Sequence, residues 1–439
     1  MNKKKQKGKT KSNPCIEAEL NRFFSPEWLR NTAKETGLIK RERKIDPVLL
    51  FWVLTLEFGV QLQRTLASLH RKYEEKGCVH ISRGSFYERF SPELVKFLHV
   101  CVMHGIEQFA SDAYLAVNSK LSIFKDLLIQ DSSIIRVHEK LADRWPAVRT
   151  RKAAAGVKIS LLISAVSDGV KHVAIHGERT SEIKTLRIGP WVKNRILLID
   201  LGFYKHYLFT KIVENGGFFI SRLKGAANPT IVSVNRTCRG NSIDLMGKRV
   251  KEVLPKLKRQ IIDVEVEVPI KRRAYKGKQK REVSKFRLIA VYNVENEKYH
   301  MYLTNISTEV LDAKDIANLY SARWHIELIF KELKSKYGID ILPTSNPEIV
   351  KALLWVGILT LLVSRKLYLI ICENNLDKAV RYTQLRWGTI FAEKSSRLMD
   401  QVLKYAGLHP DLMELYKVYE SQALDPNVNR KRLTDVWRA

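Results

Sequence analysis

Two aspartates directly follow apolar runs that are typical of buried strands. Asp131 follows DLLIQ (126–130), and Asp200 follows RILLI (195–199). A carboxylate beside such a run is costly to bury unless a cation or a metal ion compensates its charge. Taken singly, each aspartate has two interpretations: it binds an ion, or it forms the turn at the end of its strand.

A third acid lies on a predicted helix covering residues 319–336 (LYSARWHIELIFKELKSK). At 100° per residue, one stripe of this helix is apolar and the adjoining stripe carries Glu327 among cationic and aromatic side chains. Such a stripe could present a metal ligand beside phosphate-binding groups. An ordinary amphipathic helix with Glu-Lys pairs has the same pattern. The polar stripe consists of Tyr320, Arg323, Glu327, Lys331 and Lys334.

The elements around the aspartates predict an α/β fold with a ribonuclease H-like mixed sheet. A hairpin comes first, with its turn at 167–169, and strands then alternate with helices. In this order the first and fourth strands are neighbours, so Asp131 and Asp200 would face one ion. Oxygen ligands favour Mg²⁺ or Mn²⁺. The predicted strands are 126–131, 158–166, 170–176, 195–200 and 218–223, and the helices are 181–192 and 204–215.

The rest of the chain divides into segments that differ in composition and in predicted secondary structure. A basic tail without acids opens the chain, and it could be a solubilising terminus or a loose DNA-binding arm. A helical region follows, either DNA-binding or a collar on the next domain. The expected boundaries are 1–14 for the disordered tail, 15–118 for the helical DNA-binding region, 119–224 for the first part of the core, 225–312 for a β-rich basic insertion, 313–345 for the helix with the third acid, and 346–439 for a helical C-terminal region.

Local signals predict two helix starts in the N-terminal region and a basic hairpin in the insertion. Asp46-Pro47 is typical of an N-cap followed by proline, and Ser85 with Glu88 has capping-box spacing. The segment KRRAYKGKQKR (271–281) joins two alternating strands and includes Lys271, Arg272 and Arg273.

Composition limits the class of protein. The 439 residues carry a net charge of +30, which favours a polyanionic partner such as nucleic acid. Five scattered cysteines without a C-x-x-C argue against disulfide and zinc frameworks, so we expect a cytoplasmic protein. The apolar stretch 352–363 is too short to span a bilayer and predicts a buried helix, with no membrane partner.

Four other acidic residues are candidates for the role of metal ligand beside these three. Asp168 belongs to the predicted hairpin turn, and Asp143 has no assigned role. Glu178 and Glu182 fall in a polar loop, and we expect them to be solvated.

The spacing Y-x(2)-R-x(3)-E-x(6)-K, formed by Tyr320, Arg323, Glu327 and Lys334, resembles the signature of DDE transposases of bacterial insertion sequences, IS-four type. The segments DLGFY from Asp200 and FISRLK (219–224) are similar to that family as well, and Asp131 resembles its first acid. The resemblance covers roughly residues 120–345.

The resemblance implies that Asp131, Asp200 and Glu327 form a catalytic triad that binds two Mg²⁺ or Mn²⁺ ions. It implies cleavage of double-stranded DNA at transposon ends, joining of a 3′-hydroxyl to target DNA, and a homodimer in the DNA complex. It further implies that Tyr320, Arg323 and Lys334 contact phosphates, and that the protein works at the nucleoid in the bacterial cytoplasm.

One expected residue differs from the family pattern. Relatives that form DNA hairpins can stack a flipped base on a tryptophan before a Leu-Thr pair. Here Leu303-Thr304 follows Tyr299, His300 and Tyr302, with no tryptophan. We expect His300 and Tyr302 to share the strand face that would contact DNA.

Two alternatives remain at this stage. A ribonuclease H-like nuclease or resolvase would use the same ions without strand transfer, although it would not need the long insertion between Asp200 and Glu327. A transposase-derived DNA-binding protein would lack catalysis, but all three acids are present.

Overall fold

The structure is a computed structural model of the 439-residue chain. By contacts the chain forms two compact units. The helical unit comprises residues 1–108 and 331–430, and the sheet unit comprises residues 109–330 and 431–439. The described residues are 14–41, 44–60, 65–77, 79, 81–111, 120–148, 154–167, 169–236, 244–257, 259–271 and 281–408.

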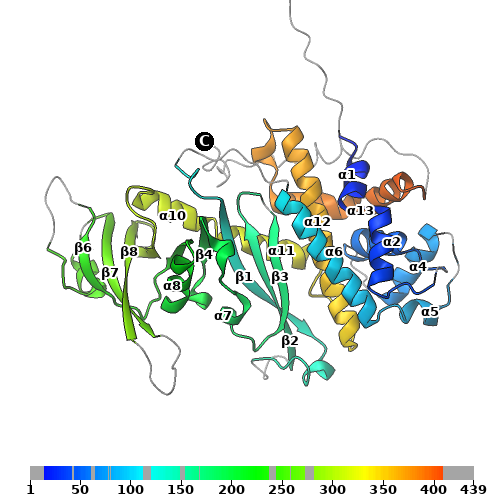
Figure 1. Ribbon diagram of the computed structural model, residues 1–439, viewed down its shortest axis with the longest axis horizontal. Coiled ribbons are helices and arrows are strands. Elements are labelled where there is room, and N and C mark those ends of the chain that lie inside the picture. Colours follow the sequence, from blue (N-terminus) through cyan, green and yellow to red (C-terminus); the bar gives the residue numbers. More distant parts are fainter. Residues whose placement is uncertain are drawn as a thin grey trace, which may run out of the picture. The chain divides into compact units, whose positions relative to one another are not determined.

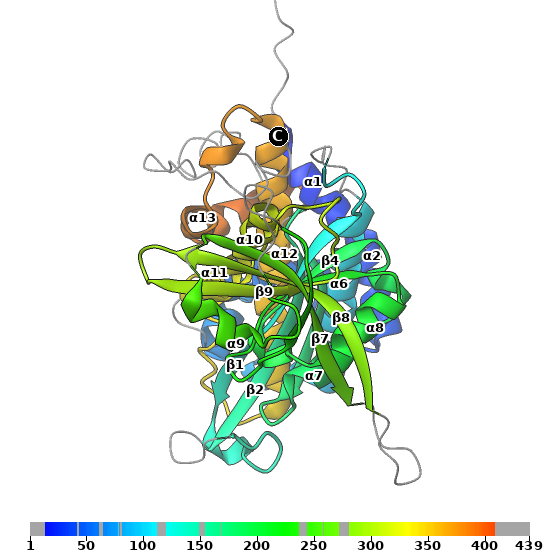
Figure 2. The ribbon, with the colours of Figure 1, turned by 90° about the vertical axis from the view of Figure 1, so that its left-hand side faces the viewer.

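The sheet unit is built on one nine-stranded sheet with the order β3-β2-β1-β4-β5-β9-β8-β7-β6 (Figures 1 and 2). Its first five strands have the ribonuclease H-like arrangement: β2 and β3 pair antiparallel beside β1, and β4 and β5 run parallel to β1. This confirms the predicted fold class. The five strands are β1 (Asp126–Val137), β2 (Ala155–Ser164), β3 (Val170–Gly177), β4 (Arg195–Ile199) and β5 (Phe218–Arg222).

The insertion continues the same sheet, which the sequence did not indicate. Strand β9 pairs antiparallel with β5, with Ile220 opposite Thr304, and the remaining strands add outward from β9. Alternating apolar residues of β7 and β8 face one core with Phe209 and Phe219, whose rings stack 4.4 Å apart. The added strands are β6 (Thr230–Val234), β7 (Ile261–Lys271), β8 (Arg281–Asn293) and β9 (Lys298–Thr304).

Three predicted elements of the sheet unit have different bounds. Strand β1 continues past Asp131 to Val137, because β2 pairs with it over that whole length. The helix expected over 181–192 is a single turn, α7 (Glu182–Thr185), followed by a 3₁₀ turn at Pro190–Val192. Helix α8 (His206–Glu214) is confirmed.

The single helix predicted over 319–336 is wrong. Helix α10 (Ala313–Ser321) ends before Ala322, and α11 (Trp324–Ser335) begins after Arg323. No glycine or proline marks this break, so the sequence periodicity runs through it. Helix α11 crosses from the sheet unit into the helical unit at Lys331.

The helical unit contains the other long helices. Asp46 caps α3 by accepting hydrogen bonds from the amides of Val48 and Leu49, as predicted. The capping residue near 85 is Ser82, three residues before the predicted one, and Glu88 ends that helix. The helices are α1 (Ile16–Phe23), α2 (Pro26–Glu35), α3 (Pro47–Trp52), a π-helix (Val53–Phe58), α4 (Leu66–Gly77), α5 (Arg83–Tyr87), α6 (Pro92–Ser111), α12 (Pro347–Asn374) and α13 (Gln384–Tyr405).

Helix α12 is the core helix of this unit. By length and composition it could cross a membrane, but 89% of its most apolar 18-residue stretch is buried inside the protein. The predicted buried helix at 352–363 is confirmed. Arg365 of α12 forms a fully buried ion pair with Glu332, and the Tyr337 hydroxyl donates to the same carboxylate at 2.6 Å.

Short turns complete the described chain. They are α9 (Val250–Val253) and the 3₁₀ turns Glu139–Leu141, Leu201–Phe203, Leu254–Lys256 and Ala379–Arg381. The turn residue Asp168, the basic tail, and the loop residues Arg272 and Arg273 lie outside the described residues, as does the side chain of Lys271.

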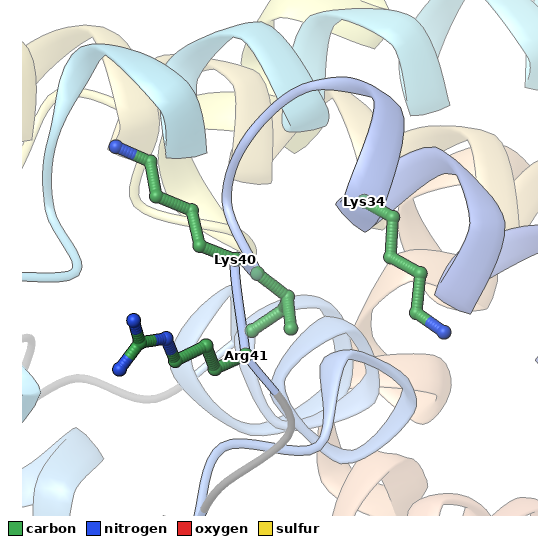
Figure 3. Close-up of a pocket in the computed structure, with 4 residues that line it drawn as sticks. Lys34, Lys40 and Arg41 are labelled. Carbon is green, nitrogen blue, oxygen red and sulfur yellow. The ribbon is translucent and has the colours of Figure 1, made fainter.

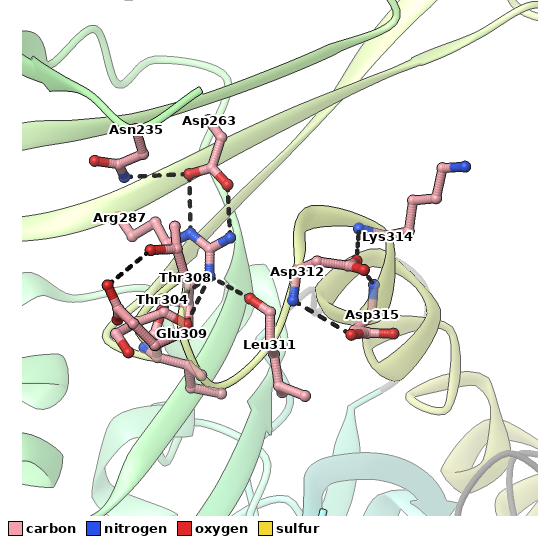
Figure 4. Close-up of polar contacts among 12 residues, drawn as sticks. Asn235, Asp263, Arg287, Thr304, Thr308, Glu309, Leu311, Asp312, Lys314 and Asp315 are labelled. Carbon is pink, nitrogen blue, oxygen red and sulfur yellow. Dashed lines mark hydrogen bonds and ion pairs between the residues drawn. The ribbon is translucent and has the colours of Figure 1, made fainter. Parts of the chain in front are cut away.

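A buried ion pair joins the insertion to the segment that leads into α10 (Figure 4). The Arg287 guanidinium donates to both carboxylate oxygens of Asp263, at 2.9 and 2.6 Å. It also donates to the carbonyls of Ile306, Ser307 and Leu311, at 3.1, 3.1 and 2.7 Å. Asp312 then caps α10. This network positions the start of the helix that carries Tyr320.

We predict that Arg287→Ala lowers the free energy of unfolding of the sheet unit by about 3 to 5 kcal/mol, because it leaves Asp263 buried without its partner. Urea unfolding followed by circular dichroism measures the change. The control is Lys285→Ala, an exposed residue of the same strand, which should stay within about 0.5 kcal/mol. A decrease below about 1 kcal/mol for Arg287→Ala would contradict the prediction.

Candidate active site

Two of the predicted acids lie next to each other because their strands are parallel neighbours. The pairing of β1 with β4 ends at Gln130 and Ile199, and Asp131 and Asp200 are the next residues on each strand. Asp200 then leaves the sheet and starts the turn Leu201–Phe203, whose Gly202 amide donates to its carboxylate at 3.4 Å. The end of the parallel pairing therefore brings the two carboxylates together.

Arg323 connects these acids to the third one. Its guanidinium lies 3.9 Å from Asp131 Oδ2, 3.8 Å from Asp200 Oδ1 and 2.5 Å from Glu327 Oε1. The break between α10 and α11 places Arg323 in a turn, one helical turn before Glu327. The three acids are thus arranged around one cation, which belongs to the protein itself.

The pKa of Asp131 is raised from 3.8 to about 6. Burial is the main cause, and the neighbouring carboxylates of Asp200 and Glu182 act in the same direction. The Ser132 amide and the Arg323 guanidinium oppose the shift. The shift therefore reflects mainly the loss of water around the carboxylate, with repulsion from the neighbouring acids as a smaller contribution that a cation between them would relieve.

Tyr320 lies beside the triad. Its hydroxyl is 3.5 Å from the carbonyl oxygen of Ile199, the residue before Asp200, and burial raises its pKa to about 12. Its ring packs on Tyr302 of β9 with centroids 5.3 Å apart. Tyr302 therefore lies near the end of β4 that carries Asp200.

The neighbouring residues of β9 alternate as expected. The hydroxyl of Tyr299 donates to the carbonyls of Leu257 (3.3 Å) and Arg259, within the insertion. His300 is paired with Val291 of β8. Stacking of a DNA base on His300 or Tyr302 stays a prediction.

Lys331 and Lys334 follow Glu327 on α11. Both belong to the part of that helix that packs within the helical unit. Their contact with phosphates likewise stays a prediction.

Glu182 is a residue that the sequence interpretation missed. It is not a solvated loop acid: its carboxylate accepts hydrogen bonds from Lys158 Nζ at 3.0 Å and Ser132 Oγ at 2.7 Å. Lys158 is only 5% exposed and also donates to the carbonyl of Thr180. A lysine inside the apolar strand KISLLISAV (158–166) was the available signal, since a buried ammonium needs an acidic partner.

Glu178 is also buried rather than solvated, because it forms an ion pair with Arg136. It belongs to the hairpin end of the sheet and not to the triad.

The donor chemistry of the triad fits a divalent cation, because three carboxylates supply only oxygen ligands. Within the described ranges, however, no three acidic, histidine or cysteine side chains are close enough to hold an ion as they stand. The Arg323 guanidinium lies between the acids. Metal binding would therefore require Arg323 to leave its carboxylate contacts.

Comparison with known proteins gives a consistent result. Residues 122–363 match the model of the "Transposase DDE domain" family. The transposase of insertion sequence element IS231F from Bacillus thuringiensis subsp. israelensis is 25% identical over 385 residues, covering 78% of this chain and 77% of that protein. The IS1151 transposase of Clostridium perfringens is 19% identical and covers 80% and 79%.

Among solved structures, the piggyBac transposase synaptic complex with hairpin DNA aligns with 96% of this chain and 87% of that one, at 12% identity and a TM-score of 0.47.

The raised pKa of Asp131 has a consequence for stability. The folded protein holds this proton more tightly than the unfolded chain, so stability is lost as pH rises from about 4 through about 6. In metal-free protein at pH 7, Asp131→Asn should therefore raise the free energy of unfolding by about 1 to 2 kcal/mol. Urea unfolding at pH 4 and pH 7 measures this, and the gain should vanish at pH 4. The exposed Asp143→Asn is the control. A destabilised Asp131→Asn at pH 7 would refute the assignment.

Proposed function

The chain belongs to the family of DDE transposases, and on that premise we propose that Asp131, Asp200 and Glu327 are its catalytic triad. The family uses divalent metal ions and acts on DNA. We propose two Mg²⁺ or Mn²⁺ ions for this site, cleavage at the ends of an insertion sequence, and joining of the freed 3′-hydroxyl to target DNA. The observation that supports this most directly is the contact of one guanidinium with all three acids.

The three carboxylates would hold the ions, which lower the pKa of a bound water or hydroxyl and stabilise charge on the leaving oxygen. Without a metal ion, the three carboxylates outweigh the single positive charge of Arg323, and the site repels a phosphate. Arg323 can compensate either the acids or a DNA phosphate. We infer that Arg323 moves from the carboxylates to a phosphate when metal and DNA bind. Lys334 and Tyr320 are proposed to contact phosphates beside it.

Positive charge on the helical unit supports a further DNA contact, made by residues outside the sheet unit that carries the three acids. A hollow of about 540 Å³ is lined, among the described residues, by Lys34, Ile39, Lys40 and Arg41, three of which are cationic (Figure 3). Lys34 lies on α2, and the other residues lie on the loop that follows it. Such a cluster is suited to backbone phosphates, which bind without sequence preference. We propose that it holds DNA next to the element's end, at the nucleoid.

A nuclease or resolvase without strand transfer is the second candidate. It would need the same triad, so the triad geometry does not separate the two. The match to insertion-sequence transposases over more than three quarters of the chain favours transposition.

We predict that Asp131→Asn, Asp200→Asn and Glu327→Gln each abolish Mg²⁺-dependent cleavage of transposon-end DNA and leave DNA binding nearly intact. The reason is that each change removes an anionic ligand without removing a phosphate contact. Asp143→Asn is the matched control and should cleave normally. Near wild-type cleavage by any one variant would remove that residue from the triad.

The same reaction separates the two candidate functions. Joined products between a cleaved end and target DNA, from a complex that sediments with two protomers, indicate a transposase. Cleavage without joining would indicate a nuclease.

We further predict that Arg323 and the basic segment act differently. Replacing Lys271, Arg272 and Arg273 by alanine should weaken binding to all DNA and reduce the salt slope by ~0.9 for each phosphate that the variant no longer neutralises. Arg323→Ala should instead slow cleavage more than it weakens DNA binding. It should also raise the affinity of the DNA-free protein for Mn²⁺, measured by electron paramagnetic resonance. Equal decreases of DNA affinity from both sets, with unchanged Mn²⁺ affinity, would contradict this division.

A further inference from the structure

A large hollow lies on the face of the sheet that does not carry Asp131. Its volume is about 1010 Å³, and its floor is formed by alternate residues of β1, β2 and β3. Leu128 is paired with Ser164 and Gln130 with Leu162 on the neighbouring strand. Because side chains alternate along a strand, Asp131 points to the opposite face from Gln130. The hollow is therefore separate from the triad.

The rim of the hollow is strongly basic. Among the described residues, its lining includes five lysine or arginine side chains and one carboxylate, Asp126. Asp126 is engaged by the Ser164 hydroxyl at 2.6 Å, and burial raises its pKa. The surplus of positive charge predicts an anionic ligand. The cations are Lys125, Lys171, Lys184, Arg187 and Arg195.

The floor and one wall are apolar and include an indole. Leu128, Leu162 and Leu186 line the hollow together with Trp191. Trp191 Nε1 donates to the carbonyl of Arg187 at 3.0 Å, and the Arg195 guanidinium donates to the carbonyl of Trp191. The indole is thus tied to the residues that supply the positive charge. A flat aromatic ring is the group that best uses such a surface.

Two polar atoms at the hollow have no hydrogen-bond partner among the described residues. They are the hydroxyl oxygen of Ser167, which is 4% exposed, and Nε2 of His176. Both residues line the hollow. Both atoms are shielded from solvent in this conformation, so the case for a ligand rests on the basic rim and the indole.

We propose that this hollow binds a single nucleotide unit, with the base on Trp191 and the apolar floor and the phosphate on the basic rim. Its volume matches that of sites for small ligands. Duplex DNA does not fit the chemistry, because its bases are stacked on one another and offer no free face. An acidic peptide would use the cations but not the indole. The nucleotide comes either from an unpaired stretch of a DNA strand or from a free nucleoside phosphate.

Binding is tested by fluorescence anisotropy with a labelled single-stranded deoxyadenylate octamer, with unlabelled deoxyadenosine monophosphate and an eight-base-pair duplex as competitors. The protein is the full-length Asp131→Asn variant, so that failure of the triad proposal leaves this test unaffected. Trp191→Ala should weaken octamer binding about 5- to 150-fold, the range expected for removal of one stacked base. Trp191→Phe keeps a ring and should retain most of the affinity. The control for removal of an exposed aromatic ring is Tyr405→Ala in the helical unit.

The charge contribution is tested by the double variant Lys184→Ala with Arg187→Ala, which should weaken binding of the octamer at least about 10-fold and flatten its salt dependence. Lys193→Ala, exposed in the same unit, is the matched control. Competition by the monophosphate would identify a free nucleotide as sufficient, and competition by single strands alone would assign the site to DNA. The proposal is overturned if folded Trp191→Ala binds like wild type, if the duplex competes as well as the single strand, or if polyglutamate competes equally in wild type and Trp191→Ala.

Discussion

Three carboxylates that share one partly buried site repel one another, and a cation between them compensates that repulsion. In the protein without metal that cation is Arg323, which contacts Asp131, Asp200 and Glu327 together. The pKa of Asp131 is nevertheless raised, mainly because the carboxyl group is buried and to a lesser degree because Asp200 and Glu182 are close. An arginine is suited to this position because its planar guanidinium can serve several carboxylates and remains charged at any physiological pH. The same property would let it bind a phosphate in the proposed state in which metal ions occupy the acids.

The sheet determines where the acids meet. Parallel pairing of β1 with β4 sets Asp131 beside Asp200, and this depends on the register Gln130 to Ile199. The insertion is not a separate domain, because its strands extend the same sheet through β9. The hydrogen bonds of Arg287 then connect the inserted strands to the segment before α10. The turn after α10 contains Arg323. Positioning of the third acid thus depends on contacts more than 80 residues away from the first two along the chain.

The sequence predicted what apolar runs and turn residues encode locally. The strands of the core follow from short apolar segments such as RILLI (195–199), and their order gave the fold class. What it missed depends on distant partners. Strand β1 continues through polar residues because β2 pairs with them, and Glu182 is held by Lys158 from another strand. The break at Ala322 interrupts a periodic helix without a glycine or proline. The Ser82 cap was missed because two serines three residues apart compete for the same role.

The pairing of β5 with β9 joins two strands that the ribosome makes at different times. Strands β1 to β5, with Asp131 and Asp200, are complete once residue 222 has been made, whereas β9, Arg323 and Glu327 follow roughly 100 residues later. At ~5 to 20 residues per second, the ribosome needs about 5 to 20 s for that interval. During it the nascent chain holds two neighbouring acids without their arginine and exposes the edge of β5. The proposed catalytic centre is consequently assembled late, and a chain truncated within the insertion carries an unprotected sheet edge, which favours chaperone binding and aggregation.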